Sequence, residues 1–513
     1  MLHKENVLII DFGSQYTQLI ARRIRELKVY SEIHPHTYPI EKIKEIKPAG
    51  IIFSGGPMSI YEEDSPQINP EIFDLGIPVL GICYGLQVVS KQFNGKIEAA
   101  EHREYGKTSL KIIADDILFD GVNRETLVWM SHGDYITKLP EGFKITAESG
   151  SSPICAISDP SRNIFGIQFH PEVAHTAEGK KILHNFLFGV CKCKGEWTPK
   201  SFIKDSIEEI KKKVGGKKAI CALSGGVDSS VAAVLMQKAI GDNLVCIHVD
   251  TGMMRKNESR DIIKMFEDNF NMHLIHIDAA ETFLSRLHGV VEPEKKRKII
   301  GNTFIEIFEE EAKKIGNIDY LIQGTLYPDV IESVSVKGAS VTIKTHHNVG
   351  GLPEKMNMKL IEPFRELFKD EVRAIGVELG LPEEFIGRHP FPGPGLAVRV
   401  LGEITKPRLD ILREADDIFI KCLKEYKVYD EIWQAFAVLL PVQTVGVMGD
   451  ARTYENVVAL RAVTSTDGMT ADWYRFNYDI LEAASNRITR SVKGVNRVVY
   501  DVSSKPPSTI EWE

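Results

Sequence analysis

Short apolar runs alternate with amphipathic stretches in the first part of the chain. The runs at residues 7–10, 50–53 and 79–82 are rich in β-branched and aliphatic residues, and a helical pattern covers residues 16–27. Strands that alternate with helices are typical of parallel βαβ units. We therefore expect an α/β domain with a largely parallel sheet at the start of the chain.

A second α/β pattern follows. Apolar strands are predicted at residues 219–223, 244–249 and 320–323, with a helix at residues 229–239. The same alternation again favours a parallel sheet. The fold class that we predict is therefore α/β, with two such domains and a smaller α+β region at the C-terminal end.

The pattern changes at two places, which we interpret as domain boundaries. Residues 191–199 form a polar stretch, and its final Pro199 favours the first turn of a new helix. Residues 388–396 contain three prolines, which excludes a helix interior or a central strand. We predict domains at residues 1–192, 193–388 and 389–513.

Composition and charge narrow the class of protein. The 513 residues are 43% hydrophobic and 26% charged, which suits about three globular domains. The net charge of −8 argues against a general polyanion-binding surface, so no nucleic acid is expected. Seven scattered cysteines without CxxC spacing favour a reducing compartment. The longest apolar runs are too short for a membrane span or a signal sequence, so we expect a cytoplasmic chain.

A cysteine stands on a predicted tight turn between a strand and a helix. Residues 77–87 read Ile-Pro-Val-Leu-Gly-Ile-Cys-Tyr-Gly-Leu-Gln, so an apolar run leads into Gly-x-Cys-x-Gly. The flanking glycines permit a turn that lifts the Cys83 side chain above the sheet, and the helix N-terminus favours the thiolate. A buried structural cysteine is the alternative, and this motif alone does not exclude it.

A second strand end supplies a base. Residues 164–172 read Ile-Phe-Gly-Ile-Gln-Phe-His-Pro-Glu, which places His170 to take the thiol proton and Glu172 to orient its ring. Residues 54–57, Ser-Gly-Gly-Pro, follow another strand and present backbone N–H groups for an oxyanion. A lone histidine at a strand end is usually structural, but the three features together predict a catalytic triad.

These motifs resemble those of the class I glutamine amidotransferase domain, over roughly residues 6–190. The resemblance implies that Cys83 attacks the side-chain amide of glutamine, forms a γ-glutamyl thioester and releases ammonia. It also implies an oxyanion hole made by the amides of Gly56 and Tyr84, and a role for Gln87 in holding glutamine.

A glycine-rich turn opens the predicted second domain. In residues 218–230 a strand leads into Ser-Gly-Gly-Val-Asp-Ser-Ser and then into a helix. The amides of such a turn bind anions, and Ser224, Ser229 and Ser230 add hydroxyl donors. The turn lacks the Gly-Lys-Ser/Thr ending of a Walker A motif, and a simple helix cap is the alternative. Asp228 suits an anion site only when Mg²⁺ bridges it to the anion.

The string Ser-Gly-Gly-Val-Asp-Ser resembles the pyrophosphatase loop of the N-type ATP pyrophosphatases. The resemblance implies that ATP is cleaved between its α and β phosphates, adenylates a carbonyl oxygen and leaves pyrophosphate in the loop. The ATP-binding residues that it implies are in the loop and at the next strand end: Ser224, Gly225, Gly226, Val227, Asp228, Ser229, Ser230 and Val249. Gly324 is added because it follows a later predicted strand, and open α/β sheets bind ligands at such strand ends.

Three further strings extend the resemblance over essentially the whole chain. They lie at residues 388–397, at 443–454 (Gln-Thr-Val-Gly-Val-Met-Gly-Asp-Ala-Arg-Thr-Tyr) and at 505–513 (Lys-Pro-Pro-Ser-Thr-Ile-Glu-Trp-Glu). They look like the family of glutamine-hydrolysing GMP synthases. The resemblance implies a carbon–nitrogen ligase that adenylates XMP and aminates it with ammonia from glutamine.

The last residues of the sequence have an unusual composition for a chain end. Chain ends are commonly frayed, but Ile510 and Trp512 are side chains that we expect to be buried. The resemblance implies that this tail folds back to bind XMP. The XMP-binding residues that it implies are Arg297, Asp450, Lys505, Thr509 and Glu511. For Arg297, an exposed basic helix face is the alternative.

Residues 342–353 have two adjacent glycines and few apolar anchors, which predicts a mobile lid. The family resemblance implies that Lys344 reaches the ATP phosphates when the lid closes. His346 and His347 are interpreted as lid residues that touch substrate, because two neighbouring loop histidines rarely form a complete metal site.

The expected partners are small molecules: glutamine, ATP with Mg²⁺, and XMP, with no organic prosthetic group. The family also suggests a homodimer. Three alternatives are a glutamine-dependent NAD synthetase, a non-catalytic nucleotide sensor and a tRNA-thiolating enzyme. The first would not need the tail at 505–513, and the second would not need both the triad and the loop. The acidic charge and the lack of a paired thiol motif disfavour the third.

Overall fold

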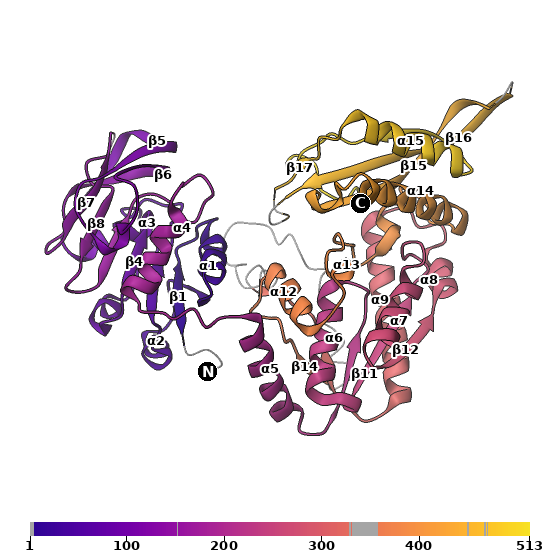
Figure 1. The fold of residues 1–513 in the computed structure, drawn as a ribbon, viewed down its shortest axis with the longest axis horizontal. Coiled ribbons are helices and arrows are strands. Elements are labelled where there is room, and N and C mark those ends of the chain that lie inside the picture. The colour runs from indigo at the N-terminus through magenta and orange to yellow at the C-terminus, as the bar shows by residue number, and fades with distance from the viewer. Residues whose placement is uncertain are drawn as a thin grey trace. The chain divides into compact units, whose positions relative to one another are not determined.

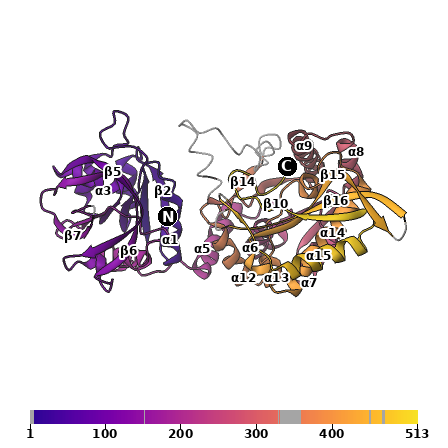
Figure 2. The ribbon, with the colours of Figure 1, turned by 90° about the horizontal axis from the view of Figure 1, so that it is seen from above.

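The computed structural model describes residues 5–150, 152–327, 330, 358–448, 451–465, 468 and 470–513. The chain divides into two compact units, Met1–Phe202 and Ile203–Glu513 (Figures 1 and 2). This division lies ten residues beyond the boundary predicted at 192/193. The boundary predicted at 388/389 lies inside the second unit, and the three-domain division stays a prediction.

The first unit is built on one nine-stranded sheet, in the order β2-β1-β3-β4-β9-β8-β7-β5-β6. Five neighbouring strands are parallel: β2 (Tyr30–Pro35), β1 (Asn6–Asp11), β3 (Gly50–Phe53), β4 (Val79–Ile82) and β9 (Ile164–Ile167). The rest pair in antiparallel fashion: β8 (Ala156–Asp159), β7 (Lys144–Ser149), β5 (Lys96–Ile112) and β6 (Glu125–Lys138). The helices are α1 (Thr17–Glu26), α2 (Ile40–Ile46), α3 (Tyr84–Gln92) and α4 (Gly179–His184).

The strands of this unit confirm the prediction from the apolar runs. β3 and β4 have the predicted bounds, and residues 7–10 lie within β1. These runs are continuous rather than alternating because β3 and β4 are buried along their whole length. The predicted helix at 16–27 is α1, one residue shorter at each end, as is usual for fraying helix ends.

The second unit begins with a five-stranded parallel sheet in the order β12-β11-β10-β13-β14. Its strands are β12 (His273–Asp278), β11 (Leu244–Asp250), β10 (Lys218–Ala222), β13 (Ile318–Ile322) and β14 (Lys359–Ile361). The accompanying helices are α5 (Pro199–Val214), α6 (Val227–Ile240), α7 (Glu258–Asn269), α8 (Ala280–Leu287), α9 (Pro293–Ile315), α12 (Lys369–Leu379) and α13 (Glu383–Ile386). Pro199 opens α5, as predicted. β13 begins two residues before the predicted strand, and α6 begins two residues before the predicted helix.

A four-stranded mixed sheet completes the second unit. Its strands are β15 (Gln434–Met448), β16 (Ala451–Thr464), β17 (Asp472–Trp473) and β18 (Val495–Tyr500), with helices α14 (Lys406–Glu425) and α15 (Tyr478–Ser491). β15 and β16 form a long antiparallel hairpin, and β18 pairs with β16 in parallel. Figure 1 shows the outer end of this hairpin projecting beyond α14 and α15.

One apolar core runs through both sheets of the second unit. It includes Ile220 and Ile247 of the parallel sheet, Leu412 of α14, Leu460 of β16 and Ile488 of α15. Shared burial of this kind makes residues 203–513 a single compact unit despite the proline-rich segment near residue 390. Across the described ranges, no helix is long and apolar enough to cross a membrane.

Candidate active sites

Cys83 sits on a strained turn between β4 and α3. Its backbone has φ of +54° and ψ of −106°, which is costly for a residue with a side chain. The glycines beside it are sterically required, because a Cβ added to Gly81 would lie 2.5 Å from the Gly85 oxygen. One added to Gly85 would lie 2.5 Å from the Phe53 oxygen. The sequence therefore builds the sharp turn that places a thiol at the end of β4.

His170 and Glu172 follow the adjacent strand, β9. The Nδ1 atom of His170 donates to Oε1 of Glu172 at 2.7 Å, and both side chains are buried. Burial opposes protonation of the imidazole, but the Glu172 carboxylate and Cys83 outweigh it and raise the pKa of His170 well above its ordinary value. With Nδ1 committed to Glu172, Nε2 is the nitrogen left to serve Cys83. The structure thus brings the three predicted triad residues together.

Several residues that the sequence analysis did not select hold this triad. Nε2 of Gln168 lies 3.8 Å from the Cys83 sulfur, and the thiol donates to the Ser131 carbonyl at 3.5 Å. The Thr176 hydroxyl donates to the His170 carbonyl at 2.5 Å, and Arg23 donates to the Glu172 carbonyl at 3.0 Å. A sequence signal existed only for Gln168, because residues two apart on a strand end share a face.

Two of the predicted oxyanion and glutamine-binding residues, Tyr84 and Gln87, lie on α3 directly after Cys83, and the third, Gly56, is in contact with Tyr84. A Cβ added to Gly56 would lie 3.1 Å from Cγ of Tyr84, so the two residues are in contact. The Tyr84 amide is the first of α3 and has no acceptor within the helix. Gln87 donates to the Asp134 carbonyl at 3.4 Å, while its buried Oε1 has no hydrogen-bond partner among the described residues.

A buried histidine supports the strand segment beside Gln87. The Nδ1 atom of His132 donates to the same Asp134 carbonyl at 3.1 Å, and its Nε2 lies 3.3 Å from Oε2 of Glu104. Burial lowers the pKa of His132 despite the nearby carboxylate. The His132 imidazole therefore helps to fix the Asp134 carbonyl that also accepts a hydrogen bond from Gln87.

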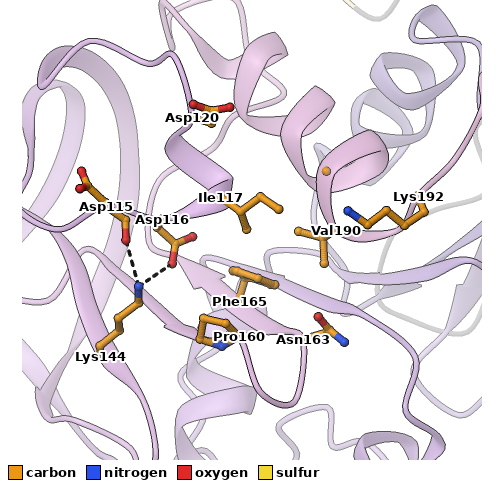
Figure 3. A pocket seen from close by; sticks show the side chains of 11 residues that line it. Asp115, Asp116, Ile117, Asp120, Lys144, Pro160, Asn163, Phe165, Val190 and Lys192 are labelled. Carbon is orange, nitrogen blue, oxygen red and sulfur yellow. Dashed lines mark hydrogen bonds and ion pairs between the residues drawn. The ribbon is translucent and has the colours of Figure 1, made fainter.

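A separate pocket of about 610 Å³ lies elsewhere in the first unit (Figure 3). Lys144 in its wall bonds the Asp115 carbonyl at 3.0 Å and pairs with Asp116 at 3.3 Å. Asn163 in the same wall precedes β9, whereas His170 follows that strand. The pocket is thus at the opposite end of β9 from the predicted triad, and it is separate from it.

The glycine-rich loop joins β10 to α6 in the second unit. Gly225 has φ of +81°, and a Cβ added there would lie 2.4 Å from Ile262. The Ser224 hydroxyl accepts from the Gly226 amide at 3.3 Å and lies 3.1 Å from that of Ser229. The buried Ser230 hydroxyl donates to the Gly226 carbonyl at 2.9 Å. These hydrogen bonds hold the loop at the N-terminus of α6. The free amides of a helix N-terminus bind anions, so this is a favourable site for a phosphate group.

The other predicted ATP-binding positions border this loop. Val249 is buried near the end of β11, the strand beside β10. A Cβ added to Gly324 would lie 3.3 Å from the backbone of Asp228, so the end of β13 lies directly against the loop. Lys369, which the sequence analysis did not select, starts α12 with its ammonium 3.6 Å from Asp228. The structure therefore brings a cation to the loop from a later part of the chain.

Asp228 has the features of a carboxylate that shares a cation with a ligand. Its buried Oδ1 has no hydrogen-bond partner among the described residues. In the same part of the chain, no group of three or more His, Cys, Asp or Glu side chains is arranged to hold a metal ion. Asp228 therefore fits Mg²⁺ that is bound mainly through ATP phosphates, and not an all-protein metal site.

The tail at residues 505–513 folds back onto the rest of the second unit. Lys505 donates to the Gly468 carbonyl at 2.8 Å, and the Thr509 hydroxyl donates to the Glu511 carbonyl at 2.5 Å. Arg399 makes two hydrogen bonds to the Glu511 carboxylate, at 2.8 and 3.1 Å, and Gln434 adds a third at 2.7 Å. The tail is therefore an ordered part of the fold.

Of the two tail side chains expected to be buried, one is. Ile510 is 8% exposed and packs with Phe436 and Val438, but Trp512 is 37% exposed, so that expectation was wrong. The reason is the ion pairs on either side: Glu511 pairs with the buried Arg399 and Glu513 with the buried Lys296, and the residue between them is left facing outward. Polar contacts, and not the indole, hold this end of the tail.

Four predicted residues lie outside the described part of the chain. They are Lys344, His346 and His347 of the predicted lid, and Asp450, which the resemblance links to XMP. The neighbours of residues 449–450, Met448 and Ala451, end β15 and begin β16. Arg297 is described, and its guanidinium donates to the main-chain oxygen of Glu513 at 2.6 Å.

Three family models match the chain in order. They are glutamine amidotransferase class-I at residues 8–190, NAD synthase at residues 200–305 and the GMP synthase C terminal domain at residues 421–512. GMP synthase [glutamine-hydrolyzing] of Carboxydothermus hydrogenoformans is 60% identical over 507 residues, which is 99% of both chains. That of Aquifex aeolicus is 59% identical over 512 residues, which is 100% of both chains, and that of Brachyspira hyodysenteriae is 57% identical over 509 residues, which is 99% of both.

A class-I glutamine amidotransferase unit and an ATP pyrophosphatase fold in one chain define a glutamine-dependent ligase. The full-length matches specify which ligase. The chain belongs to the family of glutamine-hydrolysing GMP synthases. It is a carbon–nitrogen ligase that aminates XMP to GMP with nitrogen from glutamine, and this function is favoured over an NAD synthetase or a nucleotide sensor.

Proposed function

We propose that Cys83, His170 and Glu172 are the residues that hydrolyse glutamine. The observation that carries the proposal is the 2.7 Å bond between the buried His170 and Glu172, beside a cysteine on a strained turn. The Cys83 sulfur attacks the side-chain carbonyl carbon of glutamine, and His170 delivers a proton to the departing ammonia. Water then attacks the γ-glutamyl thioester, with His170 as base, and releases glutamate.

The charge that develops on the glutamine oxygen needs fixed N–H donors. We assign this role to the Gly56 and Tyr84 amides; the support is that the two residues are in contact and that Tyr84 follows Cys83 directly. We propose that Gln87 binds the substrate through its buried Oε1, which is an acceptor free for an amino group. These assignments place the glutamine contacts on α3 and on the segment that follows β3.

The synthetase reaction is assigned to the loop at residues 224–230. XMP attacks the α-phosphorus of ATP through its 2-carbonyl oxygen, and pyrophosphate leaves into the loop amides and the hydroxyl of Ser224. Ammonia then adds to C2 and AMP leaves, so the balance is ATP, XMP, glutamine and water giving AMP, pyrophosphate, GMP and glutamate. Val249 and Gly324 line the adenosine side of this loop, by position on β11 and after β13.

We propose that Asp228 helps to hold Mg²⁺ with ATP. The support is its buried and unpaired Oδ1 at the start of α6. When bound, Mg²⁺ neutralises charge on the pyrophosphate that leaves. The ammonium of Lys369 lies 3.6 Å from the other carboxylate oxygen of Asp228, Oδ2. We propose that it adds a second positive charge near the same phosphates. Lys344 and His346 are proposed as lid residues that contact the ATP phosphates.

XMP is assigned to the surface formed by the tail and α9. Lys505 and Thr509 are proposed to bind its phosphate, and Arg297, Asp450 and Glu511 to bind nearby. The rigid hold of Arg399 on Glu511 supports this, because a binding carboxylate must keep a fixed orientation.

We propose that the protein acts as a homodimer in the cytoplasm. The outer half of the β15–β16 hairpin exposes Val445, Val447 and Tyr454, an apolar surface of the kind that a second copy covers. Seven free cysteines suit a reducing compartment.

A labelling experiment tests the assignment of the glutaminase residues. The protein is mixed with radiolabelled glutamine and quenched with acid, and peptides are mapped. The label should be found on the peptide that contains Cys83 and should be absent in Cys83→Ala. Label on any other cysteine peptide would contradict the assignment. In a separate reaction supplied with XMP, Mg-ATP and glutamine, AMP, pyrophosphate and GMP should form in equal amounts.

A further inference from the structure

Lys296 places a charged ammonium in the interior of the second unit. Its side chain, at the end of the first turn of α9, has no exposed surface, whereas Lys295 and Lys298 on the same helix are exposed. The Nζ atom donates to the Val400 carbonyl at 2.9 Å, the Ala397 carbonyl at 3.4 Å and Oε2 of Glu513 at 2.5 Å. All three protons of the ammonium are therefore used inside the protein.

Glu513 is held from several sides at the same point. Its other carboxylate oxygen accepts from the Gly402 amide at 3.4 Å, and its main-chain oxygen accepts from Arg297 at 2.6 Å. Glu513 is therefore fixed to α9 through two consecutive residues, Lys296 and Arg297. Arg297 is itself one of the residues assigned to XMP.

A buried ion pair is a costly way to stabilise a helix. Desolvation offsets most of the attraction between the charges, and an apolar pair of similar volume is often as stable. Burial lowers the pKa of the Lys296 ammonium, and the Glu513 carboxylate opposes this shift. A buried ion pair with directional hydrogen bonds fixes one geometry. The pair of Lys296 and Glu513 fixes the end of the tail against α9.

We propose that Lys296 is a positioning residue for XMP: it anchors Glu513 and thereby keeps the tail and Arg297 in the arrangement that binds the nucleotide. This inference rests on the proposed role of the tail in XMP binding. Lys296 itself does not touch substrate, because its three donors are occupied by Glu513 and by the two carbonyls.

The contact between Lys296 and Glu513 fixes only the last residues of the tail. Glu511 is two residues before Glu513, and its carboxylate is already bonded to Arg399 and Gln434. Arg461, also buried, holds the Thr509 carbonyl at 3.0 Å and pairs with Asp501 at 3.3 Å. Without Lys296, residues 501–511 keep these contacts, whereas Glu513 and Arg297 lose their fixed relation. The effect should therefore fall on XMP affinity more than on folding.

The test uses the full-length protein with four variants. Lys296→Met keeps the apolar stem and removes the charge, Glu513→Gln removes the partner charge, and a double variant removes both. Lys298→Met, on the exposed face of α9, is the matched control. XMP binding is measured by calorimetry without ATP, and ammonium-dependent GMP formation gives KM for XMP and for ATP. Thermal unfolding is recorded for each protein.

The expected result is a rise of about tenfold or more in Kd and KM for XMP in Lys296→Met and Glu513→Gln. KM for ATP and the rate of glutamine hydrolysis should stay within about twofold of wild type, as should all values for Lys298→Met. The double variant should be no worse than Lys296→Met, because the two residues form one interaction. If Lys296→Met does not fold, the Kd and KM of Glu513→Gln for XMP decide whether the inference holds.

Two outcomes would overturn the inference. One is unchanged XMP affinity in Glu513→Gln or in folded Lys296→Met. The other is a parallel loss of ATP affinity and thermal stability, which would make the pair a general structural contact. If wild type itself fails to bind XMP, the proposed role of the tail fails first, and the inference fails with it.

Discussion

The charge state of His170 follows from its two neighbours. Glu172 and Cys83 stabilise the imidazolium more than burial destabilises it, so the pKa of His170 is raised well above its ordinary value. A side chain with a raised pKa in the folded state stabilises the fold below its unfolded pKa of about 6.5. That contribution is lost as the pH rises through the higher folded value. The proposed catalytic pair of His170 and Glu172 is thus also a pH-dependent contact in the core.

Replacement of Glu172 by glutamine should show both the catalytic effect and the stability effect of the pair. Glu172→Gln keeps the shape but removes the charge that orients His170, so glutamine-dependent GMP synthesis should fall about 10³-fold or more. Ammonium-dependent synthesis should remain within about twofold. The loss of thermal stability relative to wild type should be larger at pH 6 than at pH 9. A difference in melting temperature that grows with pH would contradict the assigned sign.

The proline-rich segment near residue 390 is fixed by a buried histidine. His389 stacks on Tyr429 with ring centroids 3.8 Å apart, and its Nε2 donates to the Tyr429 carbonyl. Its Nδ1 accepts from the Ala435 amide at 3.1 Å. Burial lowers the pKa of His389 to about 4. The segment between the parallel sheet and β15 therefore depends on a neutral imidazole.

Acid should weaken this segment. Because the folded pKa is below the unfolded value, the stabilisation by His389 is complete above about pH 6.5 and is lost as the pH falls toward 4. The loss is about 3 kcal/mol over that window. In His389→Asn the dependence of the denaturation midpoint on pH between 6.5 and 4 should be shallower than in wild type. Equal slopes for the two proteins would show that His389 does not titrate in this way.

The elements that the sequence predicts well are those with local signals. β3, β4 and the turn at Cys83 follow from short apolar runs and flanking glycines, and His170 and Glu172 follow from a strand end. The contacts of the tail have no local signal. Lys296 and Glu513 are 217 residues apart, and Arg399 and Glu511 are 112 apart, so only the folded chain joins them.

Errors in the prediction have the same origin. Trp512 looks like a core residue by composition, but two buried ion pairs at its neighbours decide which way the tail faces. Lys369 reaches Asp228 from 141 positions later in the sequence, a relation that no spacing rule contains. Hydrophobic patterning therefore predicted the sheets, while long-range polar contacts had to be seen in the structure.

At the scale of the whole molecule, the hairpin of β15 and β16 predicts association. Val447 is 75% exposed, and Val445 and Tyr454 are also exposed on this hairpin. Wild type should sediment as a dimer, and Val447→Lys combined with Tyr454→Lys should shift it toward monomer, because charges on an apolar interface lose their hydration. Val377→Lys, an exposed valine on α12, serves as the control. A monomeric wild type, or a variant that remains dimeric, would contradict this interface.

The central claim is that one chain holds two separate sites, one for glutamine and one for ATP and XMP. The most direct test is GMP formation from XMP and Mg-ATP, with glutamine or ammonium chloride, in wild type and Cys83→Ala. We predict that wild type uses both nitrogen sources and that the variant uses ammonium alone, at close to the wild-type rate. Loss of ammonium-dependent synthesis in a folded Cys83→Ala would contradict two separable sites. Retention of glutamine-dependent synthesis would contradict Cys83 as the nucleophile.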